Sequence, residues 1–288
     1  MKKISIIIVT YNSTKLIRDC LSSIFNNNDI GDELDVIIVD NDSEDQKELF
    51  ELIGNDYNGV NIRCYSTGEN AGYGKGNNFG IAKTDADIIV VMNPDVRFVS
   101  PVFKRIIDEF KAPKLGMAGV DFIDGSSPYY FKPEYNTLFK SLFIHQYIKR
   151  KKYNPQTMYM SGSLLVFDRN TFIKAGMYDE NIFMYYEEPD ITNRIVKEGK
   201  EVKWLKDISV LHLAHGRKYN EKLTEIRFKS FEYYCRKYGL SALVGYKREK
   251  TILTIKKYVS IMLRDRERFD VFSKTLVCVN TKIKLLQI

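Results

Sequence analysis

The sequence predicts an α/β fold in which helices cover both faces of a mainly parallel central sheet. Three observations predict it. The chain has 288 residues, of which 44% are hydrophobic, so it is long and apolar enough to bury the core of such a fold. In its first half, short apolar runs rich in β-branched residues alternate with segments whose apolar residues recur at helical spacing. The runs are apolar without interruption, which is typical of parallel strands buried on both faces.

The first half is expected to contain four strands separated by helices. The expected strands are residues 4–9, 36–39, 61–65 and 88–92. A helix should follow the first strand over residues 16–25, with Ser13 or Thr14 as its cap. Ser100 and Pro101 are expected to open another helix, with serine at the cap and proline at the first helical position.

The second half is less regular. Residues 124–157 are rich in aromatic residues and lysine without a clear period, which predicts loops over a binding face. Further strands are expected at residues 158–167, 202–205 and 208–211. Helices are expected at residues 188–198, where Gly199 would end the helix, and at residues 221–238. The alternation of strand and helix predicts a doubly wound sheet.

Polar residues and glycines follow all four expected strands of the first half. They are, in chain order, Thr10, Tyr11, Asn12, Asp40, Asn70, Gly72, Asn78, Asn93 and Asp95. In open α/β sheets, ligands bind beyond the carboxyl ends of the strands, where such loops meet. One aspartate after a strand usually forms a turn or caps a helix. Four strands that deliver acids and amides to one edge predict a ligand-binding site.

Asp95 is the candidate metal ligand at this edge. It follows a strand of five apolar residues and comes directly after Pro94, which fixes the backbone. A carboxylate so placed can hold Mg²⁺ or Mn²⁺, which would bridge to phosphate oxygens. His212 and His215 follow a later strand, and one imidazole, that of His212, is expected to join Asp95. His215 is expected to be exposed or bonded within the protein.

Three carboxylates, those of Glu187, Glu188 and Asp190, lie within four residues beside aromatic side chains. Acids and a proline at a helix start are ordinary dipole and capping chemistry, and this segment alone favours that interpretation. The alternative is functional, because clustered carboxylates raise one another's pKa, which suits a general base.

The C-terminal part of the chain is strongly basic. Residues 217–288 carry 18 basic and 7 acidic residues, although the whole chain has a formal net charge of only +7. A helix there would place four apolar residues in one stripe flanked by cations: Ile252, Ile255, Val259 and Met262. Such a helix either packs on its own domain or lies on an anionic membrane surface. Nucleic acid is a poorer explanation because no nucleic-acid motif is present.

Taken together, these pieces resemble the family 2 glycosyltransferases of GT-A fold over roughly residues 1–240. The resemblance depends on an ordered set of motifs, at residues 5–12, 39–43, 70–80, 92–96, 176–180 and 183–190 and at His212. It is most similar to the bacterial rhamnosyltransferase-like branch, in which Asn-Pro-Asp stands for the usual Asp-x-Asp.

The resemblance implies a role for each matched position. Thr10, Tyr11 and Asp40 would hold the nucleoside, Asn78 would lie near the donor phosphates, and Asp95 would bind the metal with His212. The residues implied at the donor are Thr10, Tyr11, Asn12, Asp40, Asn70, Gly72, Asn78, Asn93 and Asp95. The family normally has an aspartate where this chain has Glu188, followed by Pro189. The base is therefore Glu188, which is preferred, or Asp190.

The implied activity is inverting transfer of a sugar, dependent on Mg²⁺ or Mn²⁺, from a nucleotide-diphosphate donor to a glycan or lipid-linked acceptor. The donor would be dTDP-rhamnose first and a UDP-hexose second, in the synthesis of a cell-surface polysaccharide. The alternative is a non-catalytic protein of the same fold that binds sugar nucleotides or serves assembly. With no signal peptide or membrane span in the sequence, a cytoplasmic protein is expected, with peripheral binding at the inner face of the cell membrane as one alternative.

The expected organisation is one large domain with a tail. Residues 1–240 would form the GT-A domain, with a nucleotide-binding half at residues 1–123 and an acceptor-binding half at residues 124–240. Residues 241–288 would form a basic helical extension.

Overall fold

The computed structural model of the chain describes residues 2–213 and 219–287. By their internal contacts, the residues form two compact units. The first, here the sheet unit, comprises Met1–Tyr130, Tyr153–Phe183 and Glu187–Ala214. The second, here the helical unit, comprises Phe131–Lys152, Met184–Tyr186 and His215–Ile288.

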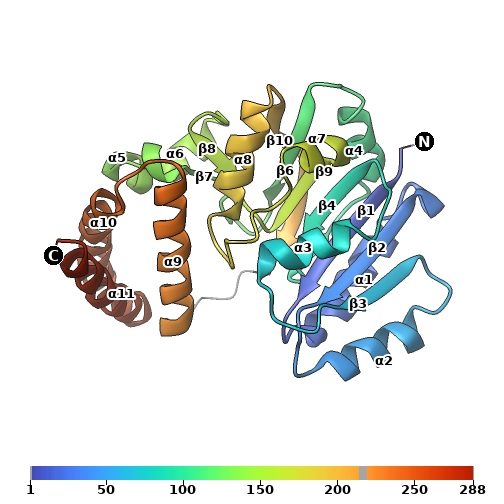
Figure 1. The fold of residues 1–288 in the computed structure, drawn as a ribbon, viewed down its shortest axis with the longest axis horizontal. Coiled ribbons are helices and arrows are strands. Elements are labelled where there is room, and N and C mark those ends of the chain that lie inside the picture. Colours follow the sequence, from blue (N-terminus) through green and yellow to red (C-terminus); the bar gives the residue numbers. More distant parts are fainter. Residues whose placement is uncertain (1, 214–218, 288) are drawn as a thin grey trace. The chain divides into compact units, whose positions relative to one another are not determined.

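An eight-stranded sheet forms the centre of the sheet unit (Figure 1). Its strands are β1 (Ile4–Thr10), β2 (Leu34–Asp40), β3 (Ile62–Ser66), β4 (Ile88–Met92), β5 (Val96–Phe98), β6 (Leu115–Phe122), β9 (Leu164–Asp168) and β10 (Glu201–His212). Their spatial order is β3-β2-β1-β4-β9-β6-β10-β5. Strands β1 to β4 are parallel to one another, as are β6 and β10. Strand β9 runs antiparallel between β4 and β6, and β5 runs antiparallel to β10. The predicted α/β class with a mainly parallel sheet is confirmed.

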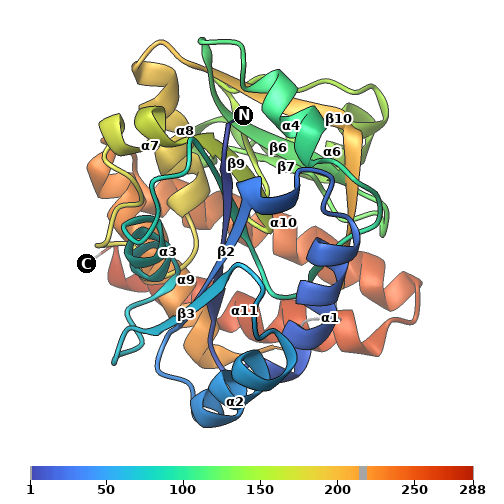
Figure 2. The same ribbon diagram turned by 90° about the vertical axis from the view of Figure 1, so that its right-hand side faces the viewer.

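Helices cover both faces of this sheet, because its strands are apolar on both sides. One face packs on α1 (Thr14–Asn26), α2 (Gln46–Asp56) and α4 (Phe103–Glu109). The other face carries α3 (Tyr73–Ile81), α7 (Arg169–Lys174) and α8 (Glu187–Lys197). Figure 2 shows α1 and α4 on one side of the sheet and α3, α7 and α8 on the other.

Helix α3 approaches the sheet unusually closely, and Gly80 permits this. A Cβ atom at Gly80 would lie 2.6 Å from Cγ2 of Ile7 and 2.9 Å from Cγ2 of Val39. Neither β-branched neighbour has room to move in a buried sheet. The last turn of α3 is thereby held directly against β1 and β2, and Gly76, earlier in the helix, lies against Val9 and Asn41 near the ends of these strands.

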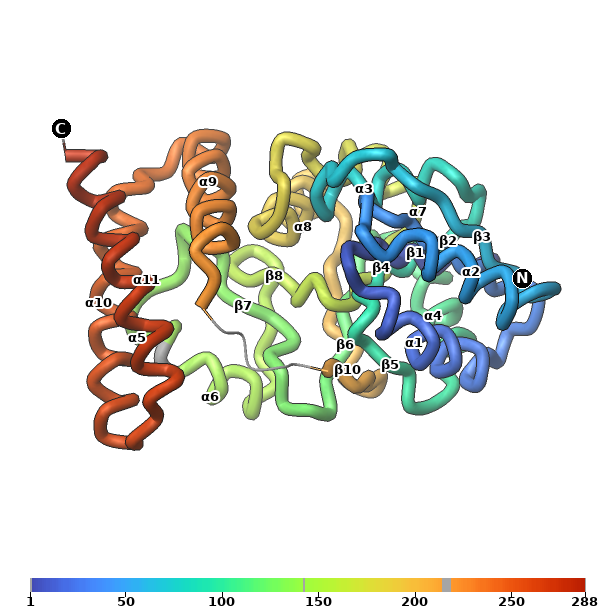
Figure 3. The backbone as a smooth tube through the Cα atoms, turned by 90° about the horizontal axis from the view of Figure 1, so that it is seen from below, coloured from blue at the N-terminus to red at the C-terminus, as the bar shows by residue number. Residues whose placement is uncertain are grey.

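The remaining elements are short or belong to the helical unit. They are the two-stranded sheet of β7 (Tyr129–Phe131) and β8 (Met158–Met160), the 3₁₀ turns Gly31–Glu33 and Pro133–Tyr135, α5 (Leu138–Leu142), α6 (Ile144–Lys149), α9 (Glu221–Lys237), α10 (Ala242–Met262) and α11 (Arg266–Leu285). Helices α10 and α11 lie side by side as a hairpin (Figure 3). Their core with α9 includes Phe228, Phe231, Tyr246, Leu253 and Val279.

Three predicted elements differ from the structure. Ser100 and Pro101 do not open a helix, because α4 begins two residues later, at Phe103, after Val102 at the cap position. They lie instead in the connection that follows β5, a three-residue strand too short for its pattern to be recognised. The strand expected at residues 158–167 is two strands, β8 and β9. The two strands expected at residues 202–211 are the single strand β10, with an irregularity between Leu205 and Ser209.

The tail and the aromatic segment also differ from expectation. Residues 124–157 contain β7, α5 and α6 besides loops. The basic tail is two helices, because the chain turns at Arg264, whose φ is 54°. The expected apolar stripe does not form one exposed or buried face, since Ile252 is buried and Met262 is exposed.

Contacts group α9 with α10 and α11, although α9 precedes the boundary expected between residues 240 and 241. That boundary, as a limit of independent folding, stays a prediction. Among the helices in the described part of the chain, none combines the length and the apolar character that a membrane span requires.

Candidate active site

The ends of β1 and β2 are tied together by Asp40. The two strands pair in parallel with Thr10 opposite Asp40, and the Thr10 hydroxyl donates to Oδ2 of Asp40 over 3.1 Å. The other oxygen, Oδ1, accepts from the Ser43 amide at 3.0 Å and from the Gln46 side chain at 2.7 Å. The buried carboxylate of Asp40 therefore shapes the loop after β2 and fixes the edge at which a ligand would meet the sheet.

Asn12 joins the loop after β1 to the loop after β2. Its backbone is left-handed, with a φ of 53°, a conformation that asparagine tolerates better than most residues. Its amide oxygen accepts from the Glu44 amide at 2.9 Å, and its own amide donates to the Ser43 hydroxyl at 2.9 Å. Next to it, Tyr11 remains 49% exposed. This leaves an aromatic ring on a rigid edge, where a planar base can stack.

Gly72 allows the loop before α3 to cross another segment of the chain. Its φ is +85°, and a side chain there would overlap the carbonyl of Phe183. The crossing is held by the Tyr73 amide, which donates to the Phe183 carbonyl at 2.8 Å, and by the Asn41 side chain, which donates to the Gly72 carbonyl at 2.9 Å. Asn70 contributes only a local turn, because its Oδ1 accepts from the Gly72 amide at 3.3 Å.

The side chain of Asn78, expected near the donor phosphates, forms hydrogen bonds within the protein. Its Nδ2 donates to the Tyr178 carbonyl at 2.9 Å and to Glu180 at 3.1 Å, and its Oδ1 accepts from the Tyr178 amide at 3.1 Å. The side chain is buried. Because both ends of the amide are bonded to the Tyr178 peptide, the geometry favours a role in holding α3, and a place near the donor phosphates stays a prediction.

Asp95 faces His212 at the turn between β4 and β5. Oδ2 of Asp95 lies 3.5 Å from Nε2 of His212. The imidazole is held on both sides, with the Ser126 hydroxyl 3.2 Å from Nδ1 and the Ser163 hydroxyl 3.3 Å from Nε2. Oδ1 of Asp95 is buried and has no hydrogen-bond partner among the described residues. A carboxylate oxygen without a partner beside an imidazole fits a divalent cation, for which these are suitable ligands.

Asp95 and His212 would be the protein's ligands in such a site. The described part of the chain has no group of three or more His, Cys, Asp or Glu side chains arranged around one point for a metal. Donor phosphate oxygens and water are the usual further ligands of Mg²⁺. His215 lies outside the described residues.

Arg97 fixes the turn that carries Asp95, and the sequence did not single it out. It is buried, and its guanidinium donates to the carbonyls of Pro94 at 2.6 Å and Val96 at 2.8 Å and, across the sheet edge, to that of Leu16 at 2.9 Å. A planar group with five donors can hold three carbonyls at once. The turn is thus anchored to the first turn of α1.

The three acids at the start of α8 have different surroundings. Asp190 is fully buried, and its Oδ2 accepts from Arg194 at 2.7 and 3.0 Å. Arg194 also donates to the Ala175 carbonyl. Glu187 is buried as well, whereas Glu188 is half-buried and its carboxylate lies against Gly162, where a Cβ atom would overlap it. Of the two candidate bases, Glu188 is the more accessible, and Asp190 has an ion-pair partner.

Tyr73, the first residue of α3, was missed by sequence reasoning. Its hydroxyl donates to the Gly162 carbonyl at 2.9 Å. Burial raises the pKa of Tyr73 well above its ordinary value, and the charges of Glu188, Glu187 and Asp95 raise it further. The only sequence signal was its position inside the glycine-rich segment after β3.

The backbone that leads into α8 is constrained. Tyr185 and Tyr186 both have a φ of 72°. Two consecutive non-glycine residues in this region are rare and cost on the order of 1 kcal/mol each. The ring of Tyr186 packs within the helical unit, with centroids 5.4 Å from Phe231 and 5.8 Å from Tyr234, and the Ser230 hydroxyl donates to the Met184 carbonyl at 2.8 Å.

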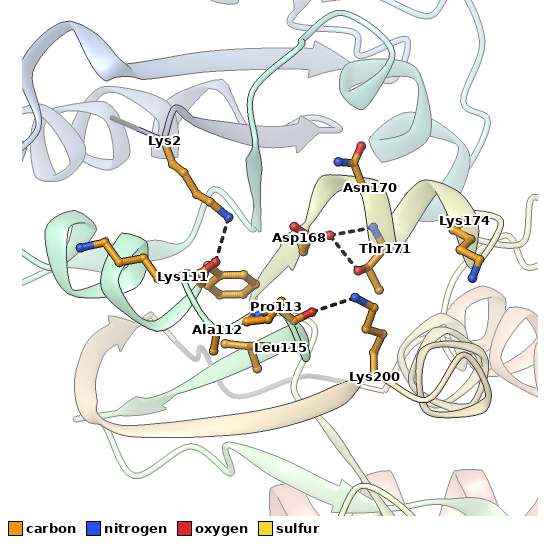
Figure 4. A pocket seen from close by; sticks show the side chains of 11 residues that line it. Lys2, Lys111, Ala112, Pro113, Leu115, Asp168, Asn170, Thr171, Lys174 and Lys200 are labelled. Atoms are coloured by element: carbon orange, nitrogen blue, oxygen red, sulfur yellow. Dashed lines mark hydrogen bonds between the residues drawn. The ribbon is translucent and has the colours of Figure 1, made fainter.

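A hollow of about 420 Å³ lies at the opposite edge of the sheet, beside the amino ends of β1 and β6 (Figure 4). Four lysines line it, and each has a partner. Lys2 and Lys200 donate to the carbonyls of Phe110 and Pro113, and Lys111 and Lys174 pair with Asp108 and Glu198. In Figure 4, Asp168 is directed to Thr171, and its carboxylate accepts hydrogen bonds from the Thr171 amide and hydroxyl. Polar groups already paired with the protein do not favour a ligand site there.

The chain is similar to known proteins in sequence and in fold. Residues 5–176 match the family model described as glycosyl transferase family 2. The chain is 25% identical over 238 residues to the low-salt glycan biosynthesis hexosyltransferase Agl10 of Haloferax volcanii, covering 79% of this chain and 70% of that protein. It is 26% identical over 189 residues to the N-acetylglucosaminyl-diphospho-decaprenol L-rhamnosyltransferase of Mycobacterium tuberculosis, covering 53% of this chain and 59% of that enzyme.

Among solved structures, the chain is similar to the mannosyltransferase PcManGT of Pyrobaculum calidifontis, in complex with GDP-Man and Mn²⁺. The TM-score is 0.66 at 14% sequence identity, over 98% of this chain and 87% of that one. At this identity the likeness concerns the fold, which is the GT-A fold.

Proposed function

The chain belongs to glycosyl transferase family 2, and from that premise we propose that it is an inverting, metal-dependent glycosyltransferase. It moves a sugar from a nucleotide-diphosphate donor to a hydroxyl of a glycan or lipid-linked acceptor in the synthesis of a cell-surface polysaccharide. One observation carries the proposal. Asp95, with a buried oxygen that has no hydrogen-bond partner among the described residues, faces His212 across 3.5 Å at the turn after β4.

The donor nucleotide is proposed to lie along the ends of β1, β2 and β4. Tyr11 offers the exposed ring on which the base stacks. Thr10, Asn12 and Asp40 act mainly by holding the loops that surround the base, since their polar atoms are bonded to one another and to Ser43 and Glu44. Asn93 lies at the start of the turn that presents Asp95 to the diphosphate.

Mg²⁺ or Mn²⁺ is the proposed cofactor, with Asp95 and His212 as the residues that hold it. A divalent cation at this place offsets the negative charge that grows on the diphosphate as it leaves. The protein contributes the orientation. The two serines keep the imidazole facing Asp95, and Arg97 holds the turn that carries the carboxylate. The mannosyltransferase of similar fold was solved with Mn²⁺, which supports this assignment.

Glu188 is the proposed general base. Its carboxylate takes the proton of the acceptor hydroxyl while the oxygen attacks the anomeric carbon from the side opposite the nucleotide. The new C–O bond forms as the bond to the diphosphate breaks, so the configuration inverts once and no covalent enzyme intermediate is needed. Asp190 is a poor candidate because its carboxylate is fully buried and already bound to Arg194.

The transferred sugar is proposed to be rhamnose from dTDP-rhamnose, with a hexose from UDP as the alternative. The mycobacterial relative is a rhamnosyltransferase and the archaeal relative is a hexosyltransferase, so the relatives support both. The mycobacterial name also describes a diphospho-decaprenol acceptor, which supports a lipid-linked acceptor here. An anionic membrane surface is accordingly the proposed partner of the C-terminal helices.

The test is a donor screen followed by a transfer assay. Purified protein is mixed with dTDP-rhamnose, UDP-hexoses or GDP-mannose, with and without Mn²⁺, and the melting temperature is measured, because a ligand of the native state raises it. The stabilising donor is then incubated with candidate acceptors, and release of the nucleoside diphosphate and the anomeric configuration of the product are measured. Metal-dependent binding with transfer and inversion is expected. Binding without transfer or donor hydrolysis would instead indicate the non-catalytic alternative.

A further inference from the structure

The bend between α10 and α11 carries a run of exposed apolar side chains. We call residues 258–263 the tip. Its exposed members are Tyr258, Val259, Ile261, Met262 and Leu263. Met262, at 82%, is exposed like a surface lysine, whereas large apolar residues are usually buried. Contiguous exposed apolar side chains of this kind mark an interaction surface.

The tip reverses the usual arrangement of a helix on a protein surface. With 100° between successive residues, the five apolar side chains cover an arc of about 200° around the end of α10. The remaining side is occupied by Ser260, which is only 3% exposed. The small polar residue therefore faces inward and the large apolar ones face outward. Earlier in the same helix, the order is normal, with Tyr246 and Leu253 in the core of the helical unit.

Cations surround the tip. Lys256, Lys257, Arg264, Arg266 and Arg268 lie within or beside it, against two acids, Asp265 and Glu267. One of these acids is engaged locally, since Asp265 caps α11 by accepting from the Arg268 amide and pairs with its side chain at 3.3 Å. The excess of positive charge disfavours a second copy of the chain, because two such tips would repel each other. It favours a surface that is both apolar and anionic.

We propose that the tip inserts into the interface of an anionic lipid bilayer. The apolar side chains of Ile261, Met262 and Leu263 reach the boundary of the acyl chains, and Tyr258 lies at the level of the headgroups. Arg264, Arg266 and Arg268 contact the anionic headgroups. Binding through the tip follows from these residues alone. Its purpose, to bring the enzyme to a lipid-linked acceptor, rests on the proposed function.

Co-sedimentation of the full-length protein with vesicles tests this inference. Vesicles of phosphatidylcholine with and without 30% phosphatidylglycerol are compared at low and high salt. The double variant Met262→Ser with Leu263→Ser is expected to bind the anionic vesicles about tenfold or more weakly than the parent. The matched control, Val277→Ser with Leu285→Ser, loses two equally exposed apolar side chains of α11 away from the tip and is expected to bind like the parent.

A spectroscopic readout tests the depth of insertion. The chain has one tryptophan, Trp204, which is buried. Met262→Trp is expected to shift its emission to the blue when anionic vesicles are added, whereas Val277→Trp is expected not to shift. Equal vesicle binding by the tip variant and the parent, or an equal spectral shift at both positions, would overturn the inference.

Two further outcomes would overturn the inference by pointing elsewhere. Equal binding to neutral and anionic vesicles would remove the role of the cations. A concentration-dependent dimer in sedimentation velocity without lipid, lost in the tip variant, would identify a second copy as the occupant. Donor hydrolysis in Mn²⁺ without vesicles is measured alongside. It should be unaffected by the tip variant, so a failure of the proposed function and a failure of this inference are distinguished.

Discussion

The rim at the ends of β1, β2 and β4 and the tip of the α10–α11 hairpin each contain a feature that a purely structural role would not require. At the rim this feature is a single polar atom. Oδ1 of Asp95 has no partner among the described residues, while the neighbouring carboxylate of Asp40 accepts three hydrogen bonds. At the tip the feature is larger and apolar, since five whole side chains face solvent around a buried serine.

This difference separates two kinds of function within one chain. An unpaired carboxylate on a rigid edge suits chemistry, because the charge is held in place and is not neutralised by the protein. Exposed apolar side chains with cations suit attachment to a surface. A buried carboxylate held in an ion pair, such as that of Asp190, should serve stability alone. Substitutions at Asp95, at the tip and at Asp190 should therefore change transfer activity, vesicle binding and stability, respectively.

The largest effect is expected from Asp95→Asn. Transfer should fall by about 10³-fold or more, since the amide cannot hold the cation that offsets charge on the leaving diphosphate. Donor affinity measured by calorimetry should rise with Mn²⁺ in the parent but not in the variant, and EDTA should remove the difference between them. The melting temperature should stay close to that of the parent. Unchanged nucleotide affinity in Mn²⁺ would refute the assignment.

The next effect is expected from Glu188→Gln. Transfer should fall by roughly 10²-fold, the usual scale for loss of a general base, while the donor binds as before. Both rates and affinities are measured, because loss of a base lowers kcat and leaves the donor complex intact. A nearly silent Glu188→Gln together with a crippling Asp190→Asn would reverse the assignment.

Asp190→Asn is the structural counterpart on the same helix. The variant leaves Arg194 without its buried partner, so the free energy of unfolding should fall by about 3–5 kcal/mol. Urea denaturation measures this, and Glu188→Gln should lie within about 0.5 kcal/mol of the parent. At a temperature where both variants are folded, Asp190→Asn should retain most of the transfer activity. Equal stability of the two variants would show that the ion pair contributes nothing.

A smaller effect is expected from Tyr11→Ala. Loss of the exposed ring should raise the KM for the donor about fivefold to tenfold, because stacking of a base on an aromatic ring contributes about 1–3 kcal/mol. The kcat should change little, since Tyr11 is proposed to bind the base and takes no part in the proton transfer. Tyr11→Phe keeps the ring and should match the parent. An effect of Tyr11→Phe as large as that of Tyr11→Ala would assign the role to the hydroxyl.

The smallest effect is expected when Met262→Ser and Leu263→Ser are combined and a water-soluble acceptor is used. Transfer should stay within about twofold of the parent, since single surface changes away from special features alter stability by about 0.5 kcal/mol or less. With an acceptor embedded in anionic vesicles, the same variant should be slower. A large loss with the soluble acceptor would show that the tip serves the rim directly and would break the comparison.

The sequence predicted the first half of the fold well. Strands β1 to β4 were expected within two residues of their ends, because continuous apolar runs between polar turns leave little choice. Strand β5 was missed, since three residues carry no period, and the antiparallel insertion of β9 could not be read from a strand's own sequence. The break between α10 and α11 was missed because helical spacing continues across Arg264.

Part of the geometry at this edge was predicted. His212 was expected beside Asp95, and Nε2 of His212 lies 3.5 Å from Oδ2 of Asp95. The use of Asn78 could not be predicted, since its partner, Tyr178, is 100 residues away. The pairing of Asp190 with Arg194, four residues on, was available from helical spacing and was overlooked.

The left-handed pair Tyr185 and Tyr186 bears on how this protein can be recombined with others. The turn that delivers Glu187 and Glu188 to the site is two residues long, and its second residue is packed on Phe231 and Tyr234 of α9. A chimera that exchanges the C-terminal helices to change the target surface would therefore also replace the packing that shapes this turn. To inherit an intact site, the exchange must keep Tyr186 and its partners on α9 together, so the graft point lies after Lys237 rather than before Asn220.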